Sequence, residues 1–136
     1  MNYNVSKLTT AAECDKAIAL ATERKADLQF EQTVSGKQFS DQDKAIQQSQ
    51  IDLITVKAQI TGMETVIAAL PAGTDKVDYE GRLRRLNDRK DNLEERLHKG
   101  GPASLLDTEL DAALYSVQIA EIDAYIAAIN AHKATL

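Results

Sequence analysis

The stretch AIQQSQIDLITVKAQITGMETVIAALPAGTD, residues 45–75, carries a seven-residue repeat that runs up to a turn. Its apolar residues recur three and four positions apart, which places them along one side of an α-helix. Ser40 can cap the start of this helix and Pro71 cannot continue it, so we expect a helix over 41–70. The first position of the repeat is held by Ile46, Leu53, Ile60 and Ile67, and the fourth by Ser49, Val56, Met63 and Leu70.

The residues after the turn repeat the pattern, which predicts a second helix over 75–99. Its first position is held by Leu83, Lys90 and Leu97, and its fourth by Tyr79, Leu86 and Leu93. Because the connection at 71–74 is short, the two helices have to be antiparallel neighbours. One register satisfies both repeats, which predicts a coiled-coil hairpin. Its layers are Ile67 with Tyr79, Met63 with Leu83, Ile60 with Leu86, Val56 with Lys90, Leu53 with Leu93, and Ser49 with Leu97.

Two further breaks lie outside the hairpin, at VSGKQFSD around Gly36 and at KGGPAS. Glycine and proline at these points predict separate helices over 11–34 and 104–133. Thr10 and Glu13 have the spacing of a capping box at the start of the first of these helices.

The predicted fold class is all-α, an antiparallel four-helix bundle with a central coiled-coil hairpin. A chain of 136 residues fits a single domain over 1–136, with residues 1–10 as an extended N-terminal arm. In an alternative arrangement, the tip of the hairpin near Pro71 projects beyond the other two helices.

Composition narrows the class of protein. Hydrophobic residues make up 43% of the chain and aromatic residues only 4%, so the core has to be aliphatic. The net charge of −5 argues against a free-standing nucleic-acid binder, which is normally basic. A single cysteine, Cys14, excludes an intrachain disulfide.

Without a signal peptide or a run of about 18 apolar residues, we expect a cytoplasmic or otherwise intracellular protein that does not span a membrane.

The predicted helix over 75–99 holds eight of the 16 basic residues, interleaved with seven acids. Arg82, Arg89 and Arg96 recur every seven residues beside the apolar seam. This interleaving is typical of the edges of a coiled coil, whereas acids in a DNA-reading region would repel phosphate. We therefore expect the arginines to meet an acidic helix of this chain or of a partner, and nucleic-acid binding is the second alternative.

The predicted helix over 104–133 carries two adjacent apolar stripes, and a helix apolar over so wide an arc has to be covered on two sides. It fills the interior of the bundle, or one stripe is a docking face for another protomer or protein. The alanine-rich stripe consists of Leu106, Leu110, Ala113, Val117, Ala120, Ala124, Ala127 and Ala131. The bulky stripe consists of Tyr115, Ile119, Ile122, Ile126 and Ile129, which are candidate protein-interaction residues together with the three arginines.

Motifs for chemistry are few. Glu95 and His98 have the E-x-x-H spacing of di-iron carboxylate bundles, but both fall on the outer face of the heptad. Cys14 lies on an apolar seam where no base can be assigned to activate it. We therefore expect no catalytic residue, no metal site and no cofactor.

These patterns favour a non-enzymatic structural or adaptor protein that acts through helix–helix contacts in an oligomer or a larger assembly. Its partners would be proteins, either further copies of the chain or other helices. The first alternative is a helical-bundle enzyme or ligand carrier with a cavity between its helices.

Overall fold

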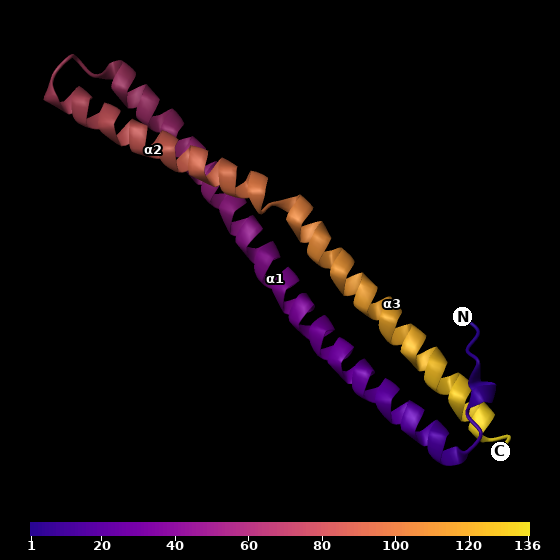
Figure 1. Ribbon diagram of the computed structural model, residues 1–136. Helices are drawn as coiled ribbons and strands as arrows, with labels where there is room; N and C mark the ends of the chain where they lie inside the picture. The colour runs from indigo at the N-terminus through magenta and orange to yellow at the C-terminus, as the bar shows by residue number, and fades with distance from the viewer. The chain divides into compact units, whose positions relative to one another are not determined.

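The computed structural model describes all residues from Met1 to Leu136, and its regular structure is entirely helical (Figure 1). A short 3-10 turn at Val5–Lys7 precedes three α-helices. Helix α1 spans Ala11–Ala69, α2 spans Thr74–Lys99 and α3 spans Pro102–Lys133. The predicted all-α class is therefore confirmed.

The predicted number of helices is wrong, because 11–34 and 41–70 belong to one continuous helix of 59 residues. Gly36 lies inside it, and a glycine costs a helix interior only about 1 kcal/mol relative to alanine. The chain is thus not the predicted four-helix bundle with a break at Gly36.

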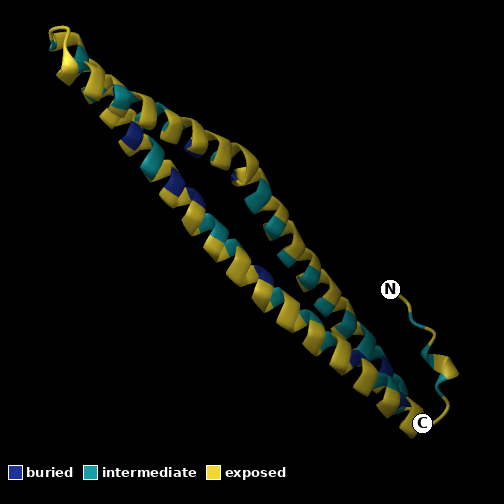
Figure 2. Cartoon of the chain, turned by 60° about the vertical axis from the view of Figure 1, so that its left-hand side comes forward, coloured by how far each residue is buried: buried dark blue, intermediate teal, exposed yellow.

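Helix α1 remains unbroken because a single heptad runs along it from end to end. Buried and half-buried residues recur three and four positions apart, so they form one stripe, the α1 seam (Figure 2). A break at Gly36 would interrupt this stripe at its middle. Its members are Cys14, Ile18, Ala21, Lys25, Leu28, Gln32, Ser35, Phe39, Gln42, Ile46, Ser49, Leu53, Val56, Ile60, Met63, Ile67 and Leu70.

The boundaries of α2 and α3 lie within two residues of the predicted ones. Helix α3 begins with Pro102, which suits a first turn because a proline there has no backbone N–H to satisfy. A Cβ on Gly101 would lie 1.9 Å from the carbonyl oxygen of Leu97, so only glycine fits between α2 and α3. Gly73 precedes α2 with a φ of 158°, a conformation that other residues rarely adopt.

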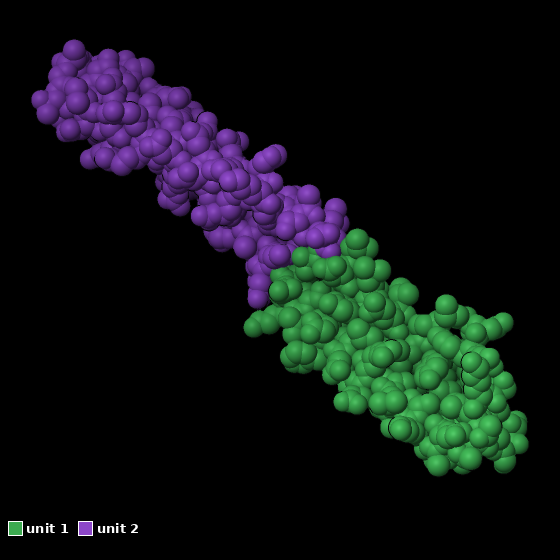
Figure 3. Space-filling view, viewed as in Figure 1, with its two compact units in different colours: residues 1–39, 108–136 green, residues 40–107 purple.

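The chain forms two compact units (Figure 3). The terminal unit consists of Met1–Phe39 and Thr108–Leu136, and the hairpin unit consists of Ser40–Asp107. Helices α1 and α3 each contribute residues to both units.

The hairpin unit packs the second half of α1 against α2. Val56, Ile60 and Leu93 form its buried cluster. On the flank, Lys57 Nζ lies 3.9 Å from a carboxylate oxygen of Glu94, so the two helices lie side by side here. The predicted seam residues Leu53, Leu83 and Leu86 pack against the cluster.

The terminal unit packs the first half of α1 against α3. Cys14 and Ile129 are fully buried in it, with 0% of their surface exposed. Polar pairs cross between the helices: Lys25 Nζ lies 2.6 Å from a carboxylate oxygen of Asp123, and the Gln32 amide donates to the Ser116 hydroxyl at 2.7 Å.

The N-terminal arm, residues 1–10, is held at its end nearest to α1 by contacts with α1 and α3. Thr10 and Glu13 form the predicted capping box, since each backbone N–H donates to the other side chain at 3.2 Å. The backbone N–H of Thr9 also donates to Glu13, and this bond lowers the pKa of the Glu13 carboxyl. Along α3, the ring Nε2 of His132 lies 2.8 Å from the carbonyl oxygen of Leu8.

We expect Gly36→Ala to stabilise the protein by about 0.5–1 kcal/mol, because alanine is the better helix former. An added Cβ there would meet no atom within 4 Å. Chemical unfolding followed by circular dichroism measures the change. Gly62→Ala, in an equally open position of α1, should stabilise similarly, whereas Gly73→Ala should destabilise. Destabilisation by Gly36→Ala would contradict a continuous helix.

We expect Ile60→Ala to destabilise the protein by about 2 kcal/mol or more, since the change leaves a cavity in the buried cluster. Ile54→Ala is the matched control on the same helix: Ile54 is 70% exposed and Ile60 only 8%. The control should change the free energy of unfolding by no more than about 0.5 kcal/mol. Equal effects of the two substitutions would contradict the register of the hairpin unit.

Candidate interaction surfaces

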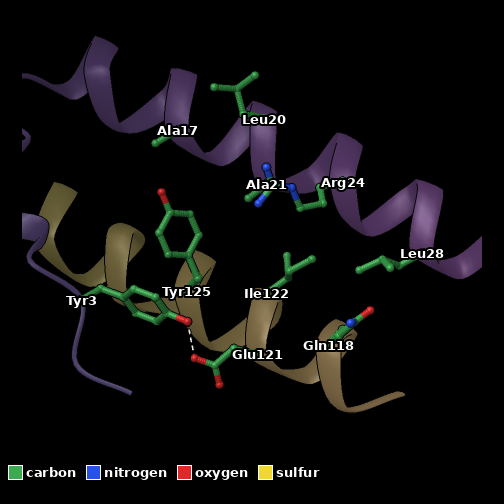
Figure 4. Close-up of a pocket in the computed structure, with 10 residues that line it drawn as sticks. All are labelled: Tyr3, Ala17, Leu20, Ala21, Arg24, Leu28, Gln118, Glu121, Ile122 and Tyr125. Atoms are coloured by element: carbon green, nitrogen blue, oxygen red, sulfur yellow. Dashed lines mark hydrogen bonds between the residues drawn. The ribbon is translucent and has the colours of Figure 1, made fainter. Parts of the chain in front are cut away.

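A groove opens between α1 and α3 in the terminal unit (Figure 4). Its volume is about 700 Å³. The groove is open to solvent, and Leu20 on its wall is 61% exposed. Polar groups at its border come from Arg24, Gln118 and Glu121. Its apolar lining consists of Ala17, Leu20, Ala21 and Leu28 from α1 and Ile122 from α3, with the tyrosine rings of Tyr3 and Tyr125.

Tyr3 brings the N-terminal arm to this groove. Its hydroxyl donates a hydrogen bond to the carboxylate of Glu121, and its ring meets Tyr125 edge-on with the centroids 4.9 Å apart (Figure 4). The bond to Glu121 raises the pKa of the Tyr3 phenol, because it favours the protonated form. The arm therefore closes one end of the groove with an aromatic pair.

The structure places the bulky stripe of α3 toward α1 of the same chain. Ile129 is fully buried, and the other four members are half-buried. Ile122 also lines the groove. Their role toward a partner stays a prediction, but the stripe already has an intramolecular role.

The alanine-rich stripe lies on the outer side of α3. Leu106, Leu110 and Val117 are 62%, 55% and 66% exposed, and the five alanines between and after them are exposed as well. The two stripes are not adjacent, contrary to the prediction, because with about 3.6 residues per turn their spacing sets them on nearly opposite sides of α3. This face of α3 therefore has no partner within the chain.

The three predicted arginines, Arg82, Arg89 and Arg96, are exposed along α2. The Arg82 guanidinium lies 5.1 Å from the centroid of the Tyr79 ring, a cation–π contact. The ion pairs of the structure are made by lysines, at Lys25, Lys57, Lys99 and Lys133. The arginines are therefore not paired with acids of their own chain.

A second exposed face, which the sequence patterns did not predict, lies on α1 in the hairpin unit. Ile51 is 56% exposed and Ile54 is 70% exposed. Thr55 and Thr61, on the same side, direct their hydroxyls to backbone carbonyls four residues earlier. The sequence feature that could have identified this face is the absence of charged residues on this side of the helix between residues 47 and 69. The uncharged α1 face consists of Gln47, Gln48, Ile51, Ile54, Thr55, Ala58, Thr61, Gly62, Thr65, Ala68 and Ala69.

Side chains that could bind a metal ion are not gathered in either unit. No three side chains of histidine, cysteine, aspartate or glutamate are arranged to hold a metal ion. Glu95 pairs with Lys99 at 2.7 Å, and His98 is exposed near the end of α2. The Ser35 hydroxyl is buried in the α1 seam without a hydrogen-bond partner.

The helical stretch Thr74–Lys133 contains one 18-residue window apolar enough to cross a membrane, with a mean hydropathy of 1.3. Length and composition alone are weak grounds for a membrane span. The apolar middle of α3 includes Glu121 and Asp123, which bond to Tyr3 and Lys25 within the terminal unit.

Comparison of the chain with protein-family models, with characterised proteins and with solved structures finds no match. The surfaces described above are therefore the basis for a functional proposal.

We expect Glu121→Gln to lower the pKa of Tyr3 toward the ordinary tyrosine value of 10.0, because the neighbouring carboxylate is removed. The measurement is a spectrophotometric titration of the four tyrosines, in which Tyr3→Phe identifies the affected step. Since folding raises this pKa, the bond supports the fold below the unfolded pKa and is lost as the pH rises through the folded pKa. Glu109→Gln, at an exposed acid on the same helix, is the control and should leave the titration unchanged. A titration insensitive to Glu121→Gln would contradict the contact.

Proposed function

We propose that this protein is a non-enzymatic structural or adaptor protein that works through contacts between helices. The observation that carries the proposal is the exposure of Leu106, Leu110 and Val117 on the outer side of α3, whose other side is already packed. Contiguous exposed apolar faces on folded chains usually mark sites of interaction. The uncharged α1 face, with Ile51 and Ile54, is a second surface of the same kind.

The hairpin unit would then be an antiparallel coiled coil that acts as a rigid support. The heptad burial along α1 and the flanking pair of Lys57 with Glu94 support this assignment. A rigid helical pair presents its outward side chains in a fixed order, which suits the recognition of another helix.

Partner helices are also a better fit to the groove of the terminal unit than a small ligand. Its volume of about 700 Å³ lies within the range of ligand sites. Such sites bury most of their ligand, however, and this groove is open to solvent. A ligand carrier is therefore the alternative that the groove supports, and an apolar helix is the occupant that we favour.

Nucleic acid and membranes are weaker candidates. The exposed Arg82, Arg89 and Arg96 favour a polyanion, but acids lie between them in the sequence, and acids offset phosphate binding. For a membrane, the two acids in the middle of α3 are costly in hydrocarbon, and both have partners in the terminal unit.

The test measures association of the full chain by sedimentation equilibrium over a wide range of concentration, alone and with any partner identified by copurification. We expect complexes larger than a monomer, and we expect Leu110→Glu/Val117→Glu or Ile51→Glu/Ile54→Glu to disrupt them. Because these residues are exposed, the variants should keep the helicity of the wild type.

Asn92→Glu, an added charge at an exposed position of α2, is the matched control and should leave association unchanged. A wild-type chain that stays monomeric, together with partner binding that none of these substitutions weakens, would overturn the proposal. Retention of a small apolar ligand by the monomer would favour the carrier instead.

A further inference from the structure

The alanine-rich stripe of α3 has a regular internal order. From Leu106 to Ala131 its members alternate at intervals of four and three residues, which is the heptad spacing of a helix that packs against another helix. Its large members, Leu106, Leu110 and Val117, lie in the first half, and its second half contains only alanine. All members are exposed.

This order makes the stripe complementary to itself in an antiparallel alignment. When two copies of α3 pack head to tail, large side chains of one copy face alanines of the other, which fills the space between the helices evenly. The alignment has a two-fold axis between Gln118 and Ile119. Its layers are Leu106 with Ala131, Leu110 with Ala127, Ala113 with Ala124, and Val117 with Ala120 of the second copy.

A parallel alignment does not have this property. It would stack the leucines of both copies at one end and alanines on alanines at the other end. The two helix axes would then be far apart at Leu110 and close together at Ala127, so the pair could not pack evenly over its length.

Charge on the flanks of the stripe also favours the antiparallel alignment. Asp107 and Glu109 lie beside the stripe at the start of α3, and head-to-tail packing brings them opposite Ala128 and Asn130 of the second copy. A parallel pair would gather the acids of both copies at the same end, where like charges repel.

The other two flanking acids are already compensated within the chain. Asp123 lies 2.6 Å from Lys25, and Glu121 accepts the hydrogen bond of Tyr3. In the antiparallel alignment they lie opposite Ser116 and Leu114 of the second copy. No acid therefore faces an acid across the contact.

We propose that a second copy of this chain docks on the alanine-rich stripe, with α3 antiparallel to α3 about a two-fold axis. The contact is isologous, since the same surface serves both copies. The inference rests on the proposed function, because it names the partner of one exposed face. It leaves the uncharged α1 face and the groove free for other helices.

Cysteine cross-linking tests the alignment in the full chain. Ala113→Cys and Ala124→Cys are introduced separately into a Cys14→Ala background, whose helicity and unfolding are first compared with the wild type. In the proposed dimer, position 113 faces position 124 of the other copy, at the short distance that a disulfide needs. Mild oxidation of the mixed single variants should therefore give covalent dimers, and each variant alone should remain largely monomeric on a denaturing gel.

Sedimentation equilibrium supplies a measurement that does not depend on the cysteines. The wild type should have twice the mass of the chain, and Val117→Glu should halve it, while Asn92→Glu leaves it unchanged. If each cysteine variant cross-links to itself, the helices are parallel and the alignment is overturned. A monomeric wild type that cross-links in no combination overturns the dimer, as does a monomer that binds phosphatidylcholine vesicles through this stripe.

These outcomes separate the inference from the function on which it rests. If the stripe forms no dimer but an identified partner is lost on Ile51→Glu/Ile54→Glu, only the self-contact fails. If the chain neither associates nor binds a helical partner through any exposed face, both proposals fail.

Discussion

The α1 seam is the constraint on which the rest of the structure depends. Within each unit, the buried positions of α1 follow heptad spacing, so the helix that covers them lies along one stripe of α1. That helix is α3 in the terminal unit and α2 in the hairpin unit. The inward-facing positions of α2 end at Leu97. The next two inward-facing residues are the buried Gly101 and the half-buried Leu105, each four residues after the one before, whereas a heptad alternates steps of four and three. The break between α2 and α3 accommodates the one residue by which this spacing exceeds a heptad. Because Gly101 has no Cβ, its backbone can lie close to the carbonyl of Leu97.

The types of residue in the α1 seam differ between the two units. In the hairpin unit it consists mainly of Ile, Leu and Val, which bury a compact aliphatic cluster. In the terminal unit it includes Ala21, Lys25, Gln32 and Ser35, and the contact with α3 relies partly on polar pairs. Small and polar seam residues hold the helices together with less apolar burial, and the groove opens beside them. The hairpin unit thus holds four of the seven buried apolar side chains, whereas the terminal unit holds eight of the 13 exposed large hydrophobic residues.

The repeats over 41–70 and 75–99 are strongly apolar and agree with each other, so the sequence predicted that the two segments pack together. The shared buried cluster of Val56, Ile60 and Leu93 agrees with this pairing, and the exact register stays a prediction. The glycine in VSGKQFSD predicted a break at Gly36. The heptad that joins Leu28 to Ile46 passes through Gln32, Ser35 and Gln42, whose polar side chains do not register as apolar periodicity. The sequence showed both stripes of α3 but did not decide which one faces inward. The choice follows from the partner, since the small residues Ala21 and Ser35 leave room for bulky isoleucines. The groove could not be predicted, because Tyr3 in its lining belongs to an arm without helical periodicity. Only the contacts of Tyr3 with Glu121 and Tyr125 fix its position.

A pair of packed helices has no enclosed interior, because each helix can cover only one side of the other. This geometry explains why only seven apolar side chains are buried although 43% of the residues are hydrophobic. Apolar residues on the outer sides therefore carry a cost in water that the chain alone does not remove. Two groups of these residues are ordered: those of the alanine-rich stripe of α3 keep heptad spacing, and Ile51 and Ile54 lie on the uncharged α1 face. Long charged side chains such as Lys and Glu would have been sufficient to keep these faces soluble. Such residues are absent from the alanine-rich stripe and from the uncharged α1 face, and this absence is the observation on which the proposal of helix–helix association rests.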